Sequence, residues 1–304
     1  MEICMRWLKA GAVGQNWMNG RKDAEAKWIF FGLLTLLAVV GCQPVGQENA
    51  PVAPTVIPRS FSDADWANVL SAVVTPDGYV TWETVQSDAG VRQSLMKYIG
   101  LIGAVSPGNH PEVFATANDR LAYWINAINA TCFYAAIEHN YPGTMLAGAP
   151  PGAIFSTEEF TFGGKRMTLH EAIRREVQPA GDPRVFFALN FCAASSPPLR
   201  TRPYDGAVLD AQLMDQGQRY LSDPRAAVRD GVEGKPSTVA VKLNDLLLVL
   251  HKTDFLDGFQ KLFGRKPTGI LEALQPYVQS DSPIVGATKV EPLGFDWRLN
   301  RPPR

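Results

Sequence analysis

The amino-acid sequence predicts an α+β fold: a helix-rich single domain around one buried apolar helix, with a small sheet. Three observations support this prediction. Residues 121–139 are apolar on nearly every face of a helix, which is typical of a helix in the centre of a domain. Several other segments repeat apolar residues every three or four positions, as amphipathic helices do. Short apolar runs between glycines and prolines indicate only a few strands.

Residues 1–41 have the order of an export signal. An apolar run, residues 28–41, follows Lys27 and is shorter than the roughly 20 residues that cross a bilayer. It ends in a Val-Val-Gly triplet before Cys42, which matches the lipobox of bacterial lipoproteins. We therefore expect a signal peptide over residues 1–41, a lipid on Cys42, and membrane attachment through that lipid. A buried core helix or a short membrane anchor is the alternative interpretation of the apolar run.

Gln43, rather than aspartate, follows the lipobox cysteine. Under the usual sorting rule of such lipoproteins, this residue predicts the outer membrane, with the domain facing the periplasm or the exterior. Residues 42–58 contain four prolines and no hydrophobic period, so we expect an extended tether. The domain then occupies residues 59–304. Met18 gives a more ordinary signal than Met1, so the true start codon stays open.

The first part of the domain predicts helices with one short strand. The spacing of apolar residues predicts a capped helix near residues 62–73 and another over residues 91–102. Between them, residues 79–82 follow an Asp-Gly turn and are a strand candidate. Asn118 and Asp119 offer a cap for the central apolar helix.

The second part mixes short strands and helices. Residues 160–162 and 167–169 flank a Gly-Gly pair and predict a hairpin, followed by a helix over residues 170–177. The unbroken apolar run of residues 184–190 predicts a buried strand. Further along, the pattern predicts an amphipathic helix, a strand and two more helices, over residues 205–221, 238–243, 245–251 and 255–263.

Composition narrows the possible partners. The formal net charge of −1 gives no electrostatic argument for nucleic-acid binding. Within the domain only Cys132 and Cys192 remain, and in an exported protein they form either a disulfide or two free thiols. The four histidines are scattered and no metal-binding spacing occurs, so we expect no metal and no cofactor.

Five segments together resemble the family known as domain of unknown function 547. They are LAYWINAINA (121–130), FGGKRMTLHEAI (162–173), DPRVFFALNFCAASSPPLR (182–200), YDGAVLDAQLMDQGQRYL (204–221) and FDWRLN (295–300). The resemblance extends from about Trp66 to the C-terminus and implies no established activity. It implies histidines at Arg174 and Phe186 and cysteines at Phe191 and Ser196, and this chain has lost all four.

Two asparagines are the polar residues that stand out in the central helix. Asn126 and Asn129 are three apart, so both amides project from one face into apolar surroundings. A buried amide needs partners, and two interpretations stay open. The amides clamp the backbone of the 191–200 turn or of the loop after Pro142, or they form the floor of a pocket. The candidate pocket residues are Asn126, Asn129, Asn190, Ser196 and Arg200.

Cys192 is the weak candidate for a catalytic residue. It follows the expected strand and precedes a turn of small residues, but activation of a thiol needs a nearby base. The sequence therefore favours an envelope lipoprotein that binds or scaffolds, with an unknown small-molecule or peptide ligand and without thiol catalysis. The alternative is a hydrolase or transferase that acts on peptide-like or amide substrates through Cys192.

Overall fold

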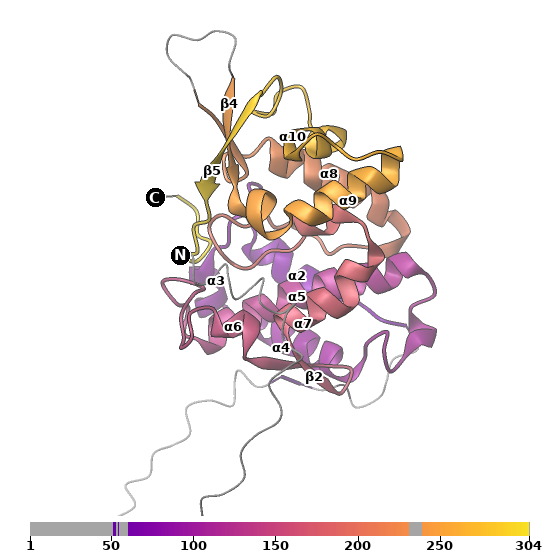
Figure 1. The fold of residues 1–304 in the computed structure, drawn as a ribbon. Helices are drawn as coiled ribbons and strands as arrows, with labels where there is room; N and C mark the ends of the chain where they lie inside the picture. Colours follow the sequence, from indigo (N-terminus) through magenta and orange to yellow (C-terminus); the bar gives the residue numbers. More distant parts are fainter. Residues whose placement is uncertain (1–50, 53, 55–59, 231–238, 304) are drawn as a thin grey trace, which may run out of the picture.

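Helix α5 (Ala117–Glu138) lies in the middle of the molecule, and the other elements surround it (Figure 1). The structure, a computed structural model, describes residues 51–52, 54, 60–230 and 239–303. Figure 1 shows the helices of the first half of the chain at one end, and α8 to α10 with strands β4 and β5 at the other. The predicted helix-rich α+β class is confirmed. The expected signal peptide and Cys42 lie outside the described residues.

Helix α5 begins four residues earlier than its apolar pattern predicts. The side chain of Thr116 accepts a hydrogen bond from the backbone N–H of Asp119 (3.0 Å), and the Asp119 carboxylate accepts one from the Thr116 N–H (2.9 Å). This reciprocal capping box satisfies two backbone donors at the helix start. Asp119 therefore contributes to the cap as expected, but Thr116, rather than Asn118, is the capping residue. Buried residues cover nearly every face of the helix, including Asn126 and Asn129.

Among the described residues, the α-helices before α5 are α2 (Ala64–Val73), α3 (Trp82–Ser87) and α4 (Ala89–Ala104). The strand expected over residues 79–82 is reduced to a single bridge between Val74 and Val80. Trp82 instead begins α3, where its buried indole donates to the carbonyl of Asn300 (2.6 Å) and packs on Phe133. Tertiary packing of the tryptophan therefore prevails over the local β preference.

The hairpin is confirmed. Strands β1 (Glu159–Phe162) and β2 (Lys165–Thr168) pair antiparallel, with Phe160 opposite Met167. Gly163 and Gly164 both have positive φ, 55° and 77°, which a two-residue hairpin turn requires. The chain continues into α7 (Leu169–Ala172) and a π-helical turn, η2 (Ile173–Val177), where a helix was predicted.

The strand predicted over residues 184–190 is wrong. Residues Pro183–Phe187 form a 3₁₀-helix, η4, whose start is capped by the Asp182 carboxylate that accepts from the N–H of Arg184 (3.0 Å). Phe187 is buried against Phe255 and Tyr277 of the C-terminal part. An unbroken apolar run marks burial on all sides, but it does not distinguish a strand from a short helix.

The small sheet comes from the C-terminal part instead. Its order is β3 (Ala227–Asp230), β4 (Ala240–Asn244) and β5 (Lys289–Gly294); β3 is antiparallel to β4 and β5 is parallel to it. The predicted strand at 238–243 corresponds to β4. The predicted helices correspond to η5 (Gly206–Val208) with α8 (Leu209–Leu221), η6 (Leu246–Leu250) and α9 (Lys252–Phe263). The remaining elements are η1 (Pro111–Val113), α6 (Ala153–Ser156), η3 (Gln178–Ala180), α10 (Ile270–Leu274) and η7 (Gln275–Tyr277).

The residues after β5 tie distant segments together. The carbonyl of Trp297 accepts from the N–H of Met145 (2.8 Å), and the carbonyl of Arg298 accepts from the N–H of Ala194 (2.7 Å). The N–H of Asn300 donates to the carbonyl of Cys192 (2.8 Å). This C-terminal strap, residues 295–300, therefore fixes the position of the loop that follows η4.

Candidate functional site

Asn126 and Asn129 hold the backbone on both sides of the 191–200 turn. The Asn129 amide donates to the carbonyl of Ala188 (2.9 Å) and accepts from the N–H of Asn190 (2.8 Å). The Asn126 amide bonds Tyr204 in the same two-sided manner, donating to its carbonyl (2.8 Å) and accepting from its N–H (2.9 Å). An amide that pairs with both groups of a backbone segment fixes that segment as a strand partner would. We call residues 188–204, held in this way, the clamped loop.

The clamped loop also has internal ties. Asn190 donates to the carbonyl of Pro197 (2.6 Å) and accepts from the N–H of Cys192 (2.7 Å). The hydroxyl of Ser196 accepts from the N–H groups of Phe191 (3.1 Å) and Ala193 (3.3 Å). All four of these backbone partners lie in a buried turn that has no regular secondary structure. Side-chain oxygens and amides therefore supply the hydrogen bonds that a helix or sheet would otherwise provide.

Only a very small cavity lies among the predicted pocket residues. Asn126, Asn129 and Arg200 line a space of about 10 Å³. One water molecule needs about that much room, so a ligand does not fit there. Arg200 is engaged as well, since its Nη1 lies 2.5 Å from the Asp215 carboxylate and its guanidinium lies 5.8 Å from the centre of the Tyr204 ring. The structure thus brings these three residues together around filled space.

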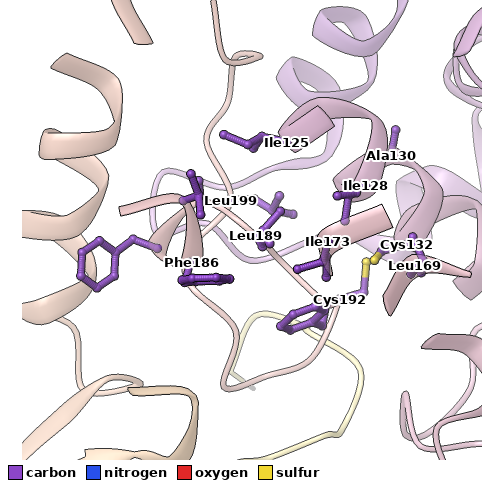
Figure 2. Packing of buried hydrophobic residues seen from close by; sticks show 14 of the residues in the cluster. Ile125, Ile128, Ala130, Cys132, Leu169, Ile173, Phe186, Leu189, Cys192 and Leu199 are labelled. Atoms are coloured by element: carbon purple, nitrogen blue, oxygen red, sulfur yellow. The ribbon is translucent and has the colours of Figure 1, made fainter. Parts of the chain in front are cut away.

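Both cysteines of the domain are free thiols and fully buried. Figure 2 shows the sulfur atoms of Cys132 and Cys192 next to each other among apolar residues. Burial raises the pKa of both thiols far above the ordinary range, and for Cys192 the neighbouring Cys132 adds to the effect. No hydrogen bond joins either sulfur to a histidine within the described residues. Without a base or access to substrate, these thiols lack the properties of a nucleophile.

A cavity of about 100 Å³ borders the clamped loop at Phe191, and we call it the aromatic pocket. Its walls come from five separate stretches of the chain. The cavity is lined by Phe155, Leu169, His170, Ile173, Gln178, Phe191, Leu250, His251 and Trp297. Phe155 meets Phe191 edge-on with ring centres 5.6 Å apart, and Trp297 lies 5.8 Å from Phe155 and 6.4 Å from Phe191.

Two histidines supply polar atoms to this pocket. Nδ1 of His251 lies 3.1 Å from a carboxylate oxygen of Asp254, and its ring stacks on Phe186 with centres 3.6 Å apart and planes 13° apart. Burial lowers the pKa of His251, although Asp254 opposes the shift. The pKa of His170 is also lowered, by burial first and then by Arg174. Both imidazoles are therefore neutral near pH 7.

The sequence patterns did not single out this pocket. His170, His251 and Trp297 stand far apart in the chain. The fold brings them together through α7, the junction of η6 and α9, and the strap. No local spacing in the sequence predicts such a site, because the residues that line it are distant from one another in the chain.

A larger cleft, about 990 Å³, opens beside the start of α2. Asp63 lines it and accepts hydrogen bonds on Oδ1 from the Tyr98 hydroxyl (2.5 Å) and the Asn126 amide (3.3 Å). Burial raises the pKa of Asp63 to about 6, against the effect of these two hydrogen bonds. The cleft is therefore connected to the clamped loop through Asn126, which contacts both Asp63 and Tyr204.

The family model described as "Protein of unknown function, DUF547" matches residues 114–221. The chain resembles this family. The match contains α5, the hairpin, η4, the clamped loop and α8, and thus four of the five similar segments, whereas the strap segment 295–300 lies beyond it. No curated protein and no solved structure matches the chain.

Three of the four positions at which the chain departs from the DUF547 pattern are buried around the clamped loop. Phe191 is a wall of the aromatic pocket, and Phe186 supports the His251 ring. Ser196 accepts two backbone hydrogen bonds. Arg174 is exposed on η2, one turn after His170. At the three buried positions, the side chains therefore pack or bind the backbone, where the resemblance implies thiols and an imidazole.

Proposed function

We propose that this protein is a cell-envelope lipoprotein, held on the outer membrane by a lipid on Cys42, whose domain binds a small ligand in the aromatic pocket without thiol chemistry. The lipobox pattern and the basic residues before it support the anchor. Among the described residues, no helix has both the length and the apolarity needed to cross a membrane. The ligand and the membrane are the partners that this proposal requires.

The observation that carries the binding function is the composition of the aromatic pocket. Ligand sites are concave and mostly apolar, with a few polar groups that orient the ligand. This pocket has three aromatic rings and two neutral imidazoles, whereas the buried amides of Asn126 and Asn129 bind backbone groups. A purely scaffolding role requires no such cavity.

The thiol-enzyme alternative has little support. A nucleophilic cysteine needs a lowered pKa and an adjacent base, whereas burial raises the pKa of Cys192 and its side chain has no exposed surface. Among the described residues no group of three or more His, Cys, Asp or Glu side chains is arranged to hold a metal ion. Binding is therefore the function that the geometry favours.

The anchor is tested by Cys42→Ser in the full chain. We expect the variant to move from the membrane fraction to the soluble fraction, because lipid attachment requires the thiol. Cys192→Ser is the matched control, which keeps the lipobox and is expected to remain in membranes. Retention of the Cys42→Ser protein after a high-salt wash contradicts the proposal and indicates that residues 28–41 stay as a membrane anchor.

The pocket is tested with xenon, an apolar probe of empty cavities. We expect xenon to perturb the NMR signals of Trp297 and Ile173 in the wild-type domain. Leu250→Trp fills the pocket from one wall and should abolish this perturbation. Leu248→Trp is the control, since Leu248 lies on the same turn, is also half-buried and does not line the pocket. Absence of a xenon effect in the wild type contradicts the binding function.

A further inference from the structure

The aromatic pocket contains a hydrogen-bond acceptor that the described protein does not use. Asp254 engages Nδ1 of His251, and a carboxylate only accepts hydrogen bonds, so the imidazole proton resides on Nδ1. In the neutral ring, Nε2 is then an acceptor. Within residues 60–230 and 239–303, no group donates a hydrogen bond to this atom. His251 lines the pocket, so Nε2 is the unused acceptor that its ring offers to a ligand there.

The surroundings hold the His251 ring in place. The ring of Phe186 covers one face at 3.6 Å, and Asp254 fixes the edge opposite Nε2. The amide of Gln178 reaches the same Asp254 carboxylate at 3.5 Å, at the limit of a hydrogen bond. A fixed ring and a fixed tautomer make the acceptor directional, since the bond at one ring nitrogen determines the state of the other.

His170 limits the charge of the ligand. Its ring faces the same pocket from α7, and no hydrogen bond to it occurs within the described residues. The charged groups nearest to the two imidazoles are Glu171, Arg174 and Asp254, and Arg174 disfavours an added positive charge. Burial disfavours a positive charge on both imidazoles, against the effect of Glu171 and Asp254, so the pocket favours a neutral ligand with a donor over a cation.

The size and walls limit its shape. A volume of about 100 Å³ is comparable with the roughly 150 Å³ of an engineered cavity that holds benzene. Aromatic rings attract another ring at centre distances of about 4.5–7 Å, in edge-to-face or offset geometry. Phe155, Phe191 and Trp297 already present both faces and edges at such spacings. The pocket therefore has room for no more than a single small ring.

We propose that the aromatic pocket binds the phenol-like ring of a neutral ligand, whose hydroxyl donates a hydrogen bond to Nε2 of His251. This inference rests on the proposed function, because it names the ligand class of the same pocket. Phenol is the simplest probe with this chemistry. Toluene has the same ring without the donor, and tetramethylammonium represents a cation bound by aromatic rings.

The test is an NMR titration of the full domain with each probe. We expect phenol to bind about 3- to 10-fold more tightly than toluene, the factor that one neutral hydrogen bond contributes. His251→Phe keeps a ring on Phe186 but removes the acceptor. It should abolish the preference for phenol, so that the ratio of the two affinities falls to about one.

A second variant tests the same hydrogen bond in case His251→Phe does not fold. Asp254→Asn permits the amide to donate to Nδ1, which moves the imidazole proton to Nε2 and converts the acceptor into a donor. We expect phenol affinity to fall while toluene affinity is retained. In the wild type, the nitrogen signal of Nε2 in His251 should shift on phenol addition.

The outcomes separate this inference from the proposed function. Equal affinity for phenol and toluene, or preferential binding of tetramethylammonium, overturns the ligand class. Xenon binding without phenol binding also overturns it, while the pocket itself remains a binding site. If xenon fails as well, both proposals fall. Phenol binding that depends on His251 and Asp254 supports both.

Discussion

The clamped loop and the aromatic pocket are neighbours with opposite polar chemistry. On the α5 side, the amides of Asn126 and Asn129 each donate to and accept from backbone groups of this chain, and Asn126 also donates to the Asp63 carboxylate. On the pocket side, His251 uses one ring nitrogen and His170 uses neither in any hydrogen bond of the described residues. The burial of a polar group therefore does not by itself indicate a binding site. The informative difference is whether its hydrogen-bonding capacity is already used.

The two regions also differ in how the chain builds them. The clamp joins one helix face to one loop, so two short segments suffice. The pocket needs walls from α6, α7, η3, the clamped loop, the η6–α9 junction and the C-terminal strap. A single substitution in the pocket changes one part of its lining, whereas a substitution in the clamp leaves buried backbone groups without partners. We therefore expect large effects on stability from substitutions in the clamp and small ones from substitutions in the pocket.

The largest effect is expected for Asn129→Leu. The substitution leaves the carbonyl of Ala188 and the N–H of Asn190 buried without partners, and each such loss costs about 1–3 kcal/mol. We expect the free energy of unfolding to fall by about 3 kcal/mol, measured by urea denaturation. Asn118→Leu, on the exposed start of α5, is the control and should change stability little. An unchanged Asn129→Leu protein would mean that the clamp is not structural.

Asp63→Asn sharpens the comparison, because Asp63 contacts the clamp and also faces the cleft. Its pKa, raised from 3.8 to about 6, shows that the native state holds the proton more tightly than the unfolded state. The contribution of Asp63 to stability is therefore greatest at low pH and is lost as the pH rises through about 4 to about 6. The neutral asparagine avoids this loss and still accepts from Tyr98.

We therefore expect Asp63→Asn to raise the free energy of unfolding by roughly 1–3 kcal/mol near about pH 8, and by little near about pH 4. Denaturation curves at the two pH values measure this. The exposed Asp77→Asn is the control and should not show the difference. A variant that is less stable at high pH would indicate that the charged carboxylate has a stabilising partner.

The sequence predicts those features whose signals are local. The α5 segment, the hairpin at 159–168 and the helix near 209–221 follow from periodicity, a Gly-Gly turn and amphipathic spacing. Residues 183–187 were misassigned because burial on all sides removes the periodicity that separates strand from helix. The asparagine pair was visible as a polar anomaly in an apolar helix. The aromatic pocket was not, since no spacing relates His170, His251 and Trp297.

Substitution of Cys192, which lies in the clamped loop, should have a smaller effect on stability. Cys192→Ala removes one buried sulfur, and we expect a loss of about 1 kcal/mol with ligand binding retained. Iodoacetamide should not modify Cys132 or Cys192 in the folded protein at about pH 8, because burial raises both pKa values, and should modify both after denaturation. Mass spectrometry counts the labels. Rapid labelling of the folded protein would revive the thiol-enzyme alternative.

The smallest effect is expected for His170→Ala, and it is the sharpest test of the contrast. Asn129 and His170 both line small cavities, yet only the asparagine has hydrogen-bond partners in the described chain. Removing the imidazole leaves no hydrogen-bond partner unpaired, and the group removed is neutral and partly desolvated. The free energy of unfolding should therefore change by less than about 0.5 kcal/mol. Leu169→Ala, at the fully buried neighbour, should cost about 2–4 kcal/mol and shows that the assay resolves effects on α7. Thermal and urea denaturation both measure this. A loss for His170→Ala as large as that for Asn129→Leu would mean that the pocket histidine is a structural residue, and that the two regions do not differ in kind.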